Sequence, residues 1–128
     1  MANPAETASF DAHSDVLAAL QPYLDCARSG DPAPVRPTMH EHAHVVGWLQ
    51  GEAHALAPDD FIGALEHIGA APNARHSVTS IEVSGKVASV RIEWDDWAGI
   101  RFTDFILLAD QGDGWKISAK VFDSHSAS

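Results

Sequence analysis

The stretch IRFTDFILLADQGDGWKISAKVF, residues 100–122, decides the fold of this chain. It holds two runs rich in β-branched and aromatic residues, 100–109 and 115–122, and such residues favour extended strands. Between the runs, Gly112-Asp113-Gly114 supplies glycines suited to a tight turn. The segment therefore predicts a β-hairpin near the end of the chain.

The same composition recurs upstream of this hairpin. Residues 76–83 and 87–97 are again rich in β-branched and aromatic side chains, with Ser84-Gly85 as a turn between them. The second half of the chain thus predicts a meander of four strands. Short strands are also expected at 44–49 and 53–56.

The first half of the chain shows helical spacing. Ser14 is a good N-cap, and apolar residues then recur at helical intervals, which predicts a helix over 14–29 with a kink at Pro22. One or two helical turns are expected over 35–42. A further helix opens at Pro58, which is followed by two aspartates that favour the positive end of a helix, and Gly69 ends it.

Helices followed by long strands predict a single α+β domain over 14–124, with the helices against one face of the sheet and a loose arm over 1–13. If the hairpins pair without irregularity, one face of the sheet is apolar and lies under the helices. The other face mixes apolar and charged groups, as an interface does, so we expect a homodimer through it, with a solvated face as the alternative. The expected dimer-face residues are Arg91, Asp104, Ile106, Lys120 and Phe122.

Composition excludes several classes of partner. Eight basic residues against eighteen acidic ones give a formal charge of −10, which argues against nucleic acid and against an anionic membrane surface. No apolar run approaches the roughly 20 residues that span a bilayer. The first ten residues lack the pattern of a signal peptide, and the single Cys26 allows no internal disulfide, so we expect a cytoplasmic protein.

Three motifs carry a resemblance to a known family: Phe102-Thr-Asp-Phe-Ile-Leu-Leu, then Gly114-Trp-Lys-Ile, then Lys120-Val-Phe. In order and spacing they resemble a bacterial subfamily labelled "putative lumazine-binding" within the nuclear transport factor 2-like (SnoaL-like) superfamily. The resemblance covers about 14–124. It implies a cone, with three helices in the concave side of a curved, mostly antiparallel sheet, and an apolar pocket at the open end. Members include isomerases, dehydratases, cyclases and epoxide hydrolases as well as binding and assembly domains, so the fold alone does not choose a function.

Pocket chemistry must come from residues that point into the cone. A histidine or Asp25 there could act as a general acid or base without any cofactor. We expect a small-molecule binding or assembly domain for an apolar ligand, or alternatively a cofactor-free isomerase, dehydratase or hydrolase that acts in the same pocket. The pocket candidates are Tyr23, Asp25, His40, His44, Trp48, Phe61, Trp94, Thr103 and Phe105.

Two further patterns have both a functional and a structural interpretation. His40-Glu-His-Ala-His44 matches H-E-x-x-H, but a zinc protease needs this motif on a long helix, and residues from His44 onward favour a strand. We therefore expect no zinc and regard the histidines as surface or pocket-rim residues. Asp104 and Lys120 form either a carboxylate base tuned by a lysine or a cross-strand ion pair, and we favour the ion pair.

Overall fold

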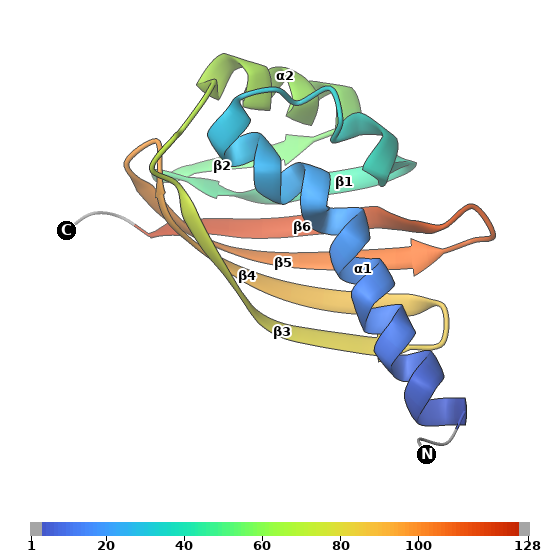
Figure 1. Cartoon of the computed structure of the whole chain (residues 1–128). Helices are drawn as coiled ribbons and strands as arrows, with labels where there is room; N and C mark the ends of the chain where they lie inside the picture. Colours follow the sequence, from blue (N-terminus) through green and yellow to red (C-terminus); the bar gives the residue numbers. More distant parts are fainter. Residues whose placement is uncertain (1–3, 126–128) are drawn as a thin grey trace.

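Six strands in the described part of the chain form one curved sheet in the order β2-β1-β6-β5-β4-β3 (Figure 1). The structure is a computed structural model, and it describes residues 4–125. Neighbouring strands pair antiparallel except β1 and β6, which are parallel. The elements in chain order are α1 (Pro4–Ser29), a 3-10 turn η1 (Arg36–Thr38), β1 (Met39–Leu49), β2 (Glu52–Leu56), α2 (Pro58–Ile68), β3 (Arg75–Ser84), β4 (Val87–Trp97), β5 (Ile100–Asp110) and β6 (Trp115–His125).

The two α-helices cover the same face of the sheet, where the hydrophobic core lies (Figure 1). Helix α1 runs across the strands and buries Val16, Leu20 and Tyr23, whose spacing of three to four residues forms one helical stripe. Helix α2 buries Phe61 and Leu65 in the same way. No helix in the described part of the chain is long and apolar enough to cross a membrane.

The prediction of an α+β fold is confirmed, but the prediction of three helices is wrong. The stretch expected to form helical turns over 35–42 contains only the 3-10 turn Arg36–Thr38, and β1 already begins at Met39. Ala43, Val45 and Gly47 are buried in alternation, which is the period of a strand. Pairing with β6 also provides backbone partners that an isolated helical turn would lack.

The N-terminal helix is longer than the sequence predicted. It begins at Pro4, so residues 4–13 of the expected loose arm are helical, and only residues 1–3 of that arm lie outside the described part. Pro22 lies inside the helix and does not end it.

Two β-bulges decide which side chains face the helices. In β4, the pairing with β5 shifts by one residue between Trp94 and Trp97. In β6, Ser118 is the extra residue where the pairing with β5 shifts. Each extra residue reverses the alternation beyond it.

The predicted assignment of the two faces was therefore wrong for β5 and for part of β6, because it assumed regular hairpins. Thr103 and Phe105 were expected to point into the cone under the helices, but the alternate residues of β5 lie there instead. The helix-facing residues of β5 and β6 include Asp104, Ile106, Leu108, Ile117 and Lys120, all buried.

Candidate functional site

A cavity of about 170 Å³ lies between helix α2 and the strands, and the β4–β5 turn contributes to its wall. Its lining is almost entirely aliphatic and aromatic, which is typical of a pocket for a small organic molecule. The polar exceptions are His54, Asp104 and Lys120. The apolar wall includes Leu49, Leu56, Phe61, Ala64, Leu65, Ile68, Trp97, Phe102 and Phe122.

Asp104 connects helix α1 to the sheet beside this cavity. Its carboxylate is 1% exposed, and Oδ2 accepts hydrogen bonds from the Tyr23 hydroxyl at 2.6 Å and from Trp94 Nε1 at 2.9 Å. Burial, followed by the nearby Asp104 charge, raises the pKa of Tyr23 well above its ordinary value, so the phenol remains a hydrogen-bond donor. The buried carboxylate is thus held by two donors from different elements.

Lys120 brings an amine into the same apolar region. Its Nζ lies 4.0 Å from Asp104 Oδ1, and the residue is 7% exposed. Burial lowers the pKa of Lys120, while Asp104 and Cys26 act in the opposite direction. The Nζ atom lies over four aromatic rings, at 4.5 Å from the Phe61 centroid, 4.8 Å from Tyr23, 5.0 Å from Phe122 and 5.8 Å from Trp97.

Two buried polar atoms in the cavity lining have no hydrogen-bond partner among the described residues. They are Nε1 of Trp97 and Nε2 of His54. A buried polar group without a partner costs about 1–3 kcal/mol, so most are satisfied in folded proteins. His54 Nε2 lies 3.9 Å from Glu52 Oε2, so Trp97 Nε1 is the position where a bound molecule could supply a missing hydrogen bond.

The β4–β5 turn places Trp97 in this wall at the expense of backbone strain. Asp96 and Ala98, on either side of it, both have positive φ values, 54° and 55°. Outside glycine such conformations are uncommon and tend to cluster at functional sites. The Asp96 carboxylate accepts a hydrogen bond from the Gly99 N–H at 3.1 Å, which stabilises the turn.

The predicted pocket residues do not all come together. Phe61 lines the cavity, and Tyr23 and Trp94 are buried beside it through Asp104. Asp25 is on the exposed side of α1, where it accepts a hydrogen bond from Gln21. The other predicted residues, which do not line this cavity, are His40, His44, Trp48, Thr103 and Phe105.

Of the residues expected on a dimer face, Arg91 is exposed on the outer face of the sheet. Asp104, Ile106 and Lys120 are buried under the helices, and Phe122 lines the cavity. Their expected place on an outer interface was therefore wrong. The physical reason is the pair of bulges that reverses the alternation.

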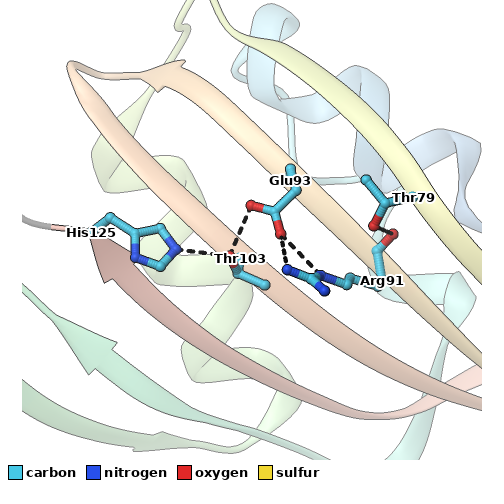
Figure 2. A network of polar contacts seen from close by, with 5 residues as sticks. All are labelled: Thr79, Arg91, Glu93, Thr103 and His125. Carbon is cyan, nitrogen blue, oxygen red and sulfur yellow. Dashed lines mark hydrogen bonds and ion pairs between the residues drawn. The ribbon is translucent and has the colours of Figure 1, made fainter.

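Thr103 belongs instead to a polar network on the outer face of the sheet, shown in Figure 2. Its hydroxyl donates to Glu93 Oε2 at 2.9 Å and lies 2.8 Å from His125 Nε2. Since the only hydroxyl proton is directed at Glu93, His125 must donate and cannot be the base that activates the hydroxyl. Burial opposes the charged form of Glu93, but the hydrogen bonds from Thr103 and Arg91 outweigh it and lower its pKa, so the network is a structural ion pair.

The H-E-x-x-H match lies on strand β1, so it lacks the helical geometry of a zinc protease. His40 and His42 are neighbours on this strand, with ring centroids 5.5 Å apart. Within residues 4–125 no group of three or more His, Cys, Asp or Glu side chains is arranged to hold a metal ion.

Sequence reasoning missed His54 and Trp97 and placed Lys120 on the wrong face. A signal was present for Trp97, because Asp95 and Asp96 interrupt the apolar alternation of β4 just before it. Such an interruption is typical of a bulge. No comparable signal marked His54.

Comparison with known proteins agrees with this architecture. The family model described as "Putative lumazine-binding" matches residues 11–123. A solved NTF2-like protein of unknown function from Methylobacillus flagellatus KT is 27% identical, with a TM-score of 0.84 over 91% of this chain and 94% of the other. One from Silicibacter pomeroyi DSS-3 is also 27% identical, with a TM-score of 0.82 over 90% and 97%.

More distant structures share the fold. A ketosteroid isomerase-like protein from Erwinia carotovora atroseptica SCRI1043 is 17% identical, with a TM-score of 0.67 over 88% of this chain and 95% of the other. No curated protein matches the sequence. The match over residues 11–123, together with the NTF2-like structures, shows that the chain belongs to the "Putative lumazine-binding" family of the nuclear transport factor 2-like superfamily.

Proposed function

We propose that this protein binds one small, mainly apolar molecule in the cavity beside α2. The observation that carries the proposal is the mainly apolar wall of the cavity, which includes the Trp97 side chain, whose buried Nε1 has no hydrogen-bond partner. A ligand with a hydrogen-bond acceptor would satisfy the Trp97 N–H, and its apolar body would fill the remaining space. Burying that body contributes about 25 cal/mol per Å² of apolar surface.

The size of the cavity limits the ligand. An apolar protein cavity of about 150 Å³ can hold one benzene molecule, so the volume of about 170 Å³ suits a single six-membered ring or a short branched chain. The family description names lumazine, a bicyclic pteridine with hydrogen-bonding groups around its edge. The apolar wall supports a less polar and smaller ligand.

Thermal shift with toluene, benzyl alcohol and lumazine tests this proposal. We expect the two single-ring compounds to raise the melting temperature and lumazine to have a smaller effect. Ala64 lines the cavity, so Ala64→Leu should fill it and abolish the shift, while Ala53→Leu, at an exposed position on β2, should preserve it. No shift with any single-ring compound, or equal shifts in both variants, would contradict the proposal.

The enzymatic alternative requires a proton acceptor in the same cavity. His54 supports it, because its side chain lines the wall, its buried Nε2 has no hydrogen-bond partner, and an imidazole can act as a general base. His54→Gln tests this alternative, because an enzyme that uses the imidazole as its base loses turnover of its substrate.

We also propose a homodimer through the outer face of the sheet. Trp48 and Phe105 are 55% and 53% exposed, and Val121 lies between their strands, paired with Val46 on one side and Phe105 on the other. A continuous exposed apolar surface of this kind supports an interface, and a second copy of the same face is self-complementary. This outer apolar patch consists of Val46, Trp48, Phe105, Leu107 and Val121.

A further inference from the structure

We propose that the Lys120 amine forms an imine with a small apolar aldehyde or ketone bound in the cavity. This inference rests on the proposed function, because it assumes that a ligand enters the same space. It adds the chemical class of that ligand, a carbonyl compound, and the atom to which it bonds, Lys120 Nζ.

The position of the amine supports this chemistry. Lys120 lines the cavity, and among the described residues its Nζ donates no hydrogen bond to a protein group. The rings of Tyr23, Phe61 and Phe122 lie around it at 4.5–5.0 Å and restrict its movement. An amine held at the wall of an apolar cavity meets a bound carbonyl carbon without competition from bulk water, which would hydrolyse the product.

The surroundings also favour the neutral amine that attacks a carbonyl. The titratable groups near Lys120 are Asp104, Tyr23, Cys26 and, in the same cavity wall, His54. Burial dominates over the opposing influence of Asp104 and Cys26, so the pKa of Lys120 is lowered. Desolvation of this kind activates lysines that form imines.

The reaction balances without an oxidant or reductant. The ammonium first transfers a proton to Asp104, whose Oδ1 lies 4.0 Å from Nζ. The nitrogen lone pair then forms the C–N bond, the carbonyl π electrons move to oxygen, and one of the two nitrogen protons passes to that oxygen to give a neutral carbinolamine. The hydroxyl takes the proton held by Asp104 and leaves as water, and loss of the remaining nitrogen proton gives the imine. Overall, ammonium and carbonyl give imine, one water and one proton.

Trp97 has a part in this scheme. Its side chain lines the same cavity, and its buried N–H has no hydrogen-bond partner among the described residues, so it is a candidate donor to the carbonyl oxygen, which carries increasing negative charge as nitrogen adds. The same donor would hold the carbonyl before the reaction. Trp97 would thereby donate a hydrogen bond to the same oxygen both in the non-covalent complex and during formation of the C–N bond.

The chain offers a direct test because it has only three lysines, Lys86, Lys116 and Lys120. Benzaldehyde with sodium cyanoborohydride converts an imine into a stable benzylamine, which peptide mass spectrometry locates. Lys86 is 78% exposed, and Lys116 is paired with Asp113 at 3.1 Å, so both serve as internal controls. A lowered pKa raises the neutral fraction of an amine at a given pH, so we expect labelling at Lys120 to exceed labelling at Lys86. This ratio should increase as the pH falls toward neutrality.

Toluene separates failure of this inference from failure of the proposed function, because it has the ring without the carbonyl. Excess toluene should suppress labelling at Lys120 and leave Lys86 unchanged, and this competition needs only the wild-type protein. Lys120→Arg removes the amine nucleophile, so it should take no benzyl group at position 120. If toluene stabilises the protein but Lys120 is labelled no faster than Lys86, the imine proposal is overturned and the binding function stands. If neither toluene nor benzaldehyde stabilises the protein, both proposals fail.

Discussion

The Tyr23 hydroxyl donates a 2.6 Å hydrogen bond to Asp104 across 81 positions of the chain. It joins the C-terminal third of helix α1 to a strand in the interior of the sheet. Because Trp94 donates to the same carboxylate oxygen, the helix and two adjacent strands share one buried polar centre. These hydrogen bonds to one carboxylate fix how the helix lies on the sheet, because a buried carboxylate that loses one of its hydrogen-bond donors destabilises the fold.

Replacing Tyr23 by phenylalanine should destabilise the protein. The change removes one of two hydrogen bonds to a buried carboxylate, and hydrogen bonds to charged groups contribute about 1.5–3 kcal/mol. The free energy of unfolding from urea titration measures the loss. Asp25→Asn, on the exposed side of the same helix, is the matched control and should remain within about 0.5 kcal/mol of wild type. Equal stability of Tyr23→Phe and wild type would show that the bond contributes nothing.

Stability should depend on alkaline pH through Lys120. Its folded-state pKa is lowered, so between that pKa and the unfolded value of about 10.4 the unfolded state binds more protons. The free energy of unfolding therefore rises with pH in this window. Lys120→Met has no such proton to lose, so its curve should lack this rise. Urea titrations of both proteins at a series of pH values measure the difference, and parallel curves would contradict the assignment.

Tyr23 should make the free energy of unfolding fall with rising pH, at higher pH than the rise caused by Lys120. The folded-state pKa of Tyr23 is raised, so above the unfolded value of about 10 the folded state keeps a proton that the unfolded state loses. Stability should fall as the pH rises beyond that point. Tyr23→Phe should lack the fall, and ultraviolet absorbance at alkaline pH should show that the phenol ionises only as the protein unfolds.

The outer apolar patch should mediate dimerisation. Light scattering of the wild type is expected to give twice the chain mass of 13.7 kDa. Phe105→Glu places a charge opposite its counterpart in a self-complementary face and should give a monomer that still folds, because Phe105 is exposed in the single chain. Leu17→Glu, at an exposed position on helix α1, should leave the dimer intact. A wild-type monomer at micromolar concentration would refute this interface.

Replacement of glycine by alanine should stabilise the protein at position 63 and destabilise it at position 47. Gly63 lies inside helix α2 with open space around its missing Cβ, so Gly63→Ala should stabilise the protein by about 0.5–1 kcal/mol. At Gly47 a Cβ would lie 2.1 Å from the Phe122 carbonyl oxygen, so Gly47→Ala must push strands β1 and β6 apart. We expect a loss of about 1–3 kcal/mol, as for other overpacked sites. Urea titration of the two variants measures the change in the free energy of unfolding for each.

Local sequence signals were sufficient for most elements of the fold. The four long strands near the C-terminus follow from β-branched runs separated by glycine turns, and α2 follows from Pro58, two aspartates and Gly69. The early strand β1 was harder to predict, because its pairing with β6 joins segments far apart in the chain. Propensity alone cannot represent such a long-range partner.

The site was less predictable than the fold for a geometric reason. The sequence grouped Asp104 with Lys120 on one face of the sheet, as the register confirms. The sequence could not determine whether that face lies under the helices or on the outside of the sheet, because each bulge reverses the alternation of side chains. The position of a bulge depends on backbone conformation more than on side-chain type. Phe105, which was expected under the helices, is exposed on the outer face. Lys120, which was expected on the outer face, is buried under the helices.

The extra residue at Ser118 has a consequence for how the last strand can change in length. Ile117 pairs with Leu108, Ala119 with Leu107 and Lys120 with Ile106, and Ser118 is passed over in this register. A single-codon deletion of Ser118 could therefore leave all three pairs in place, with the Lys120 amine still under the helices. Among homologues, a one-residue alignment gap at this position would not indicate that the amine has left the interior.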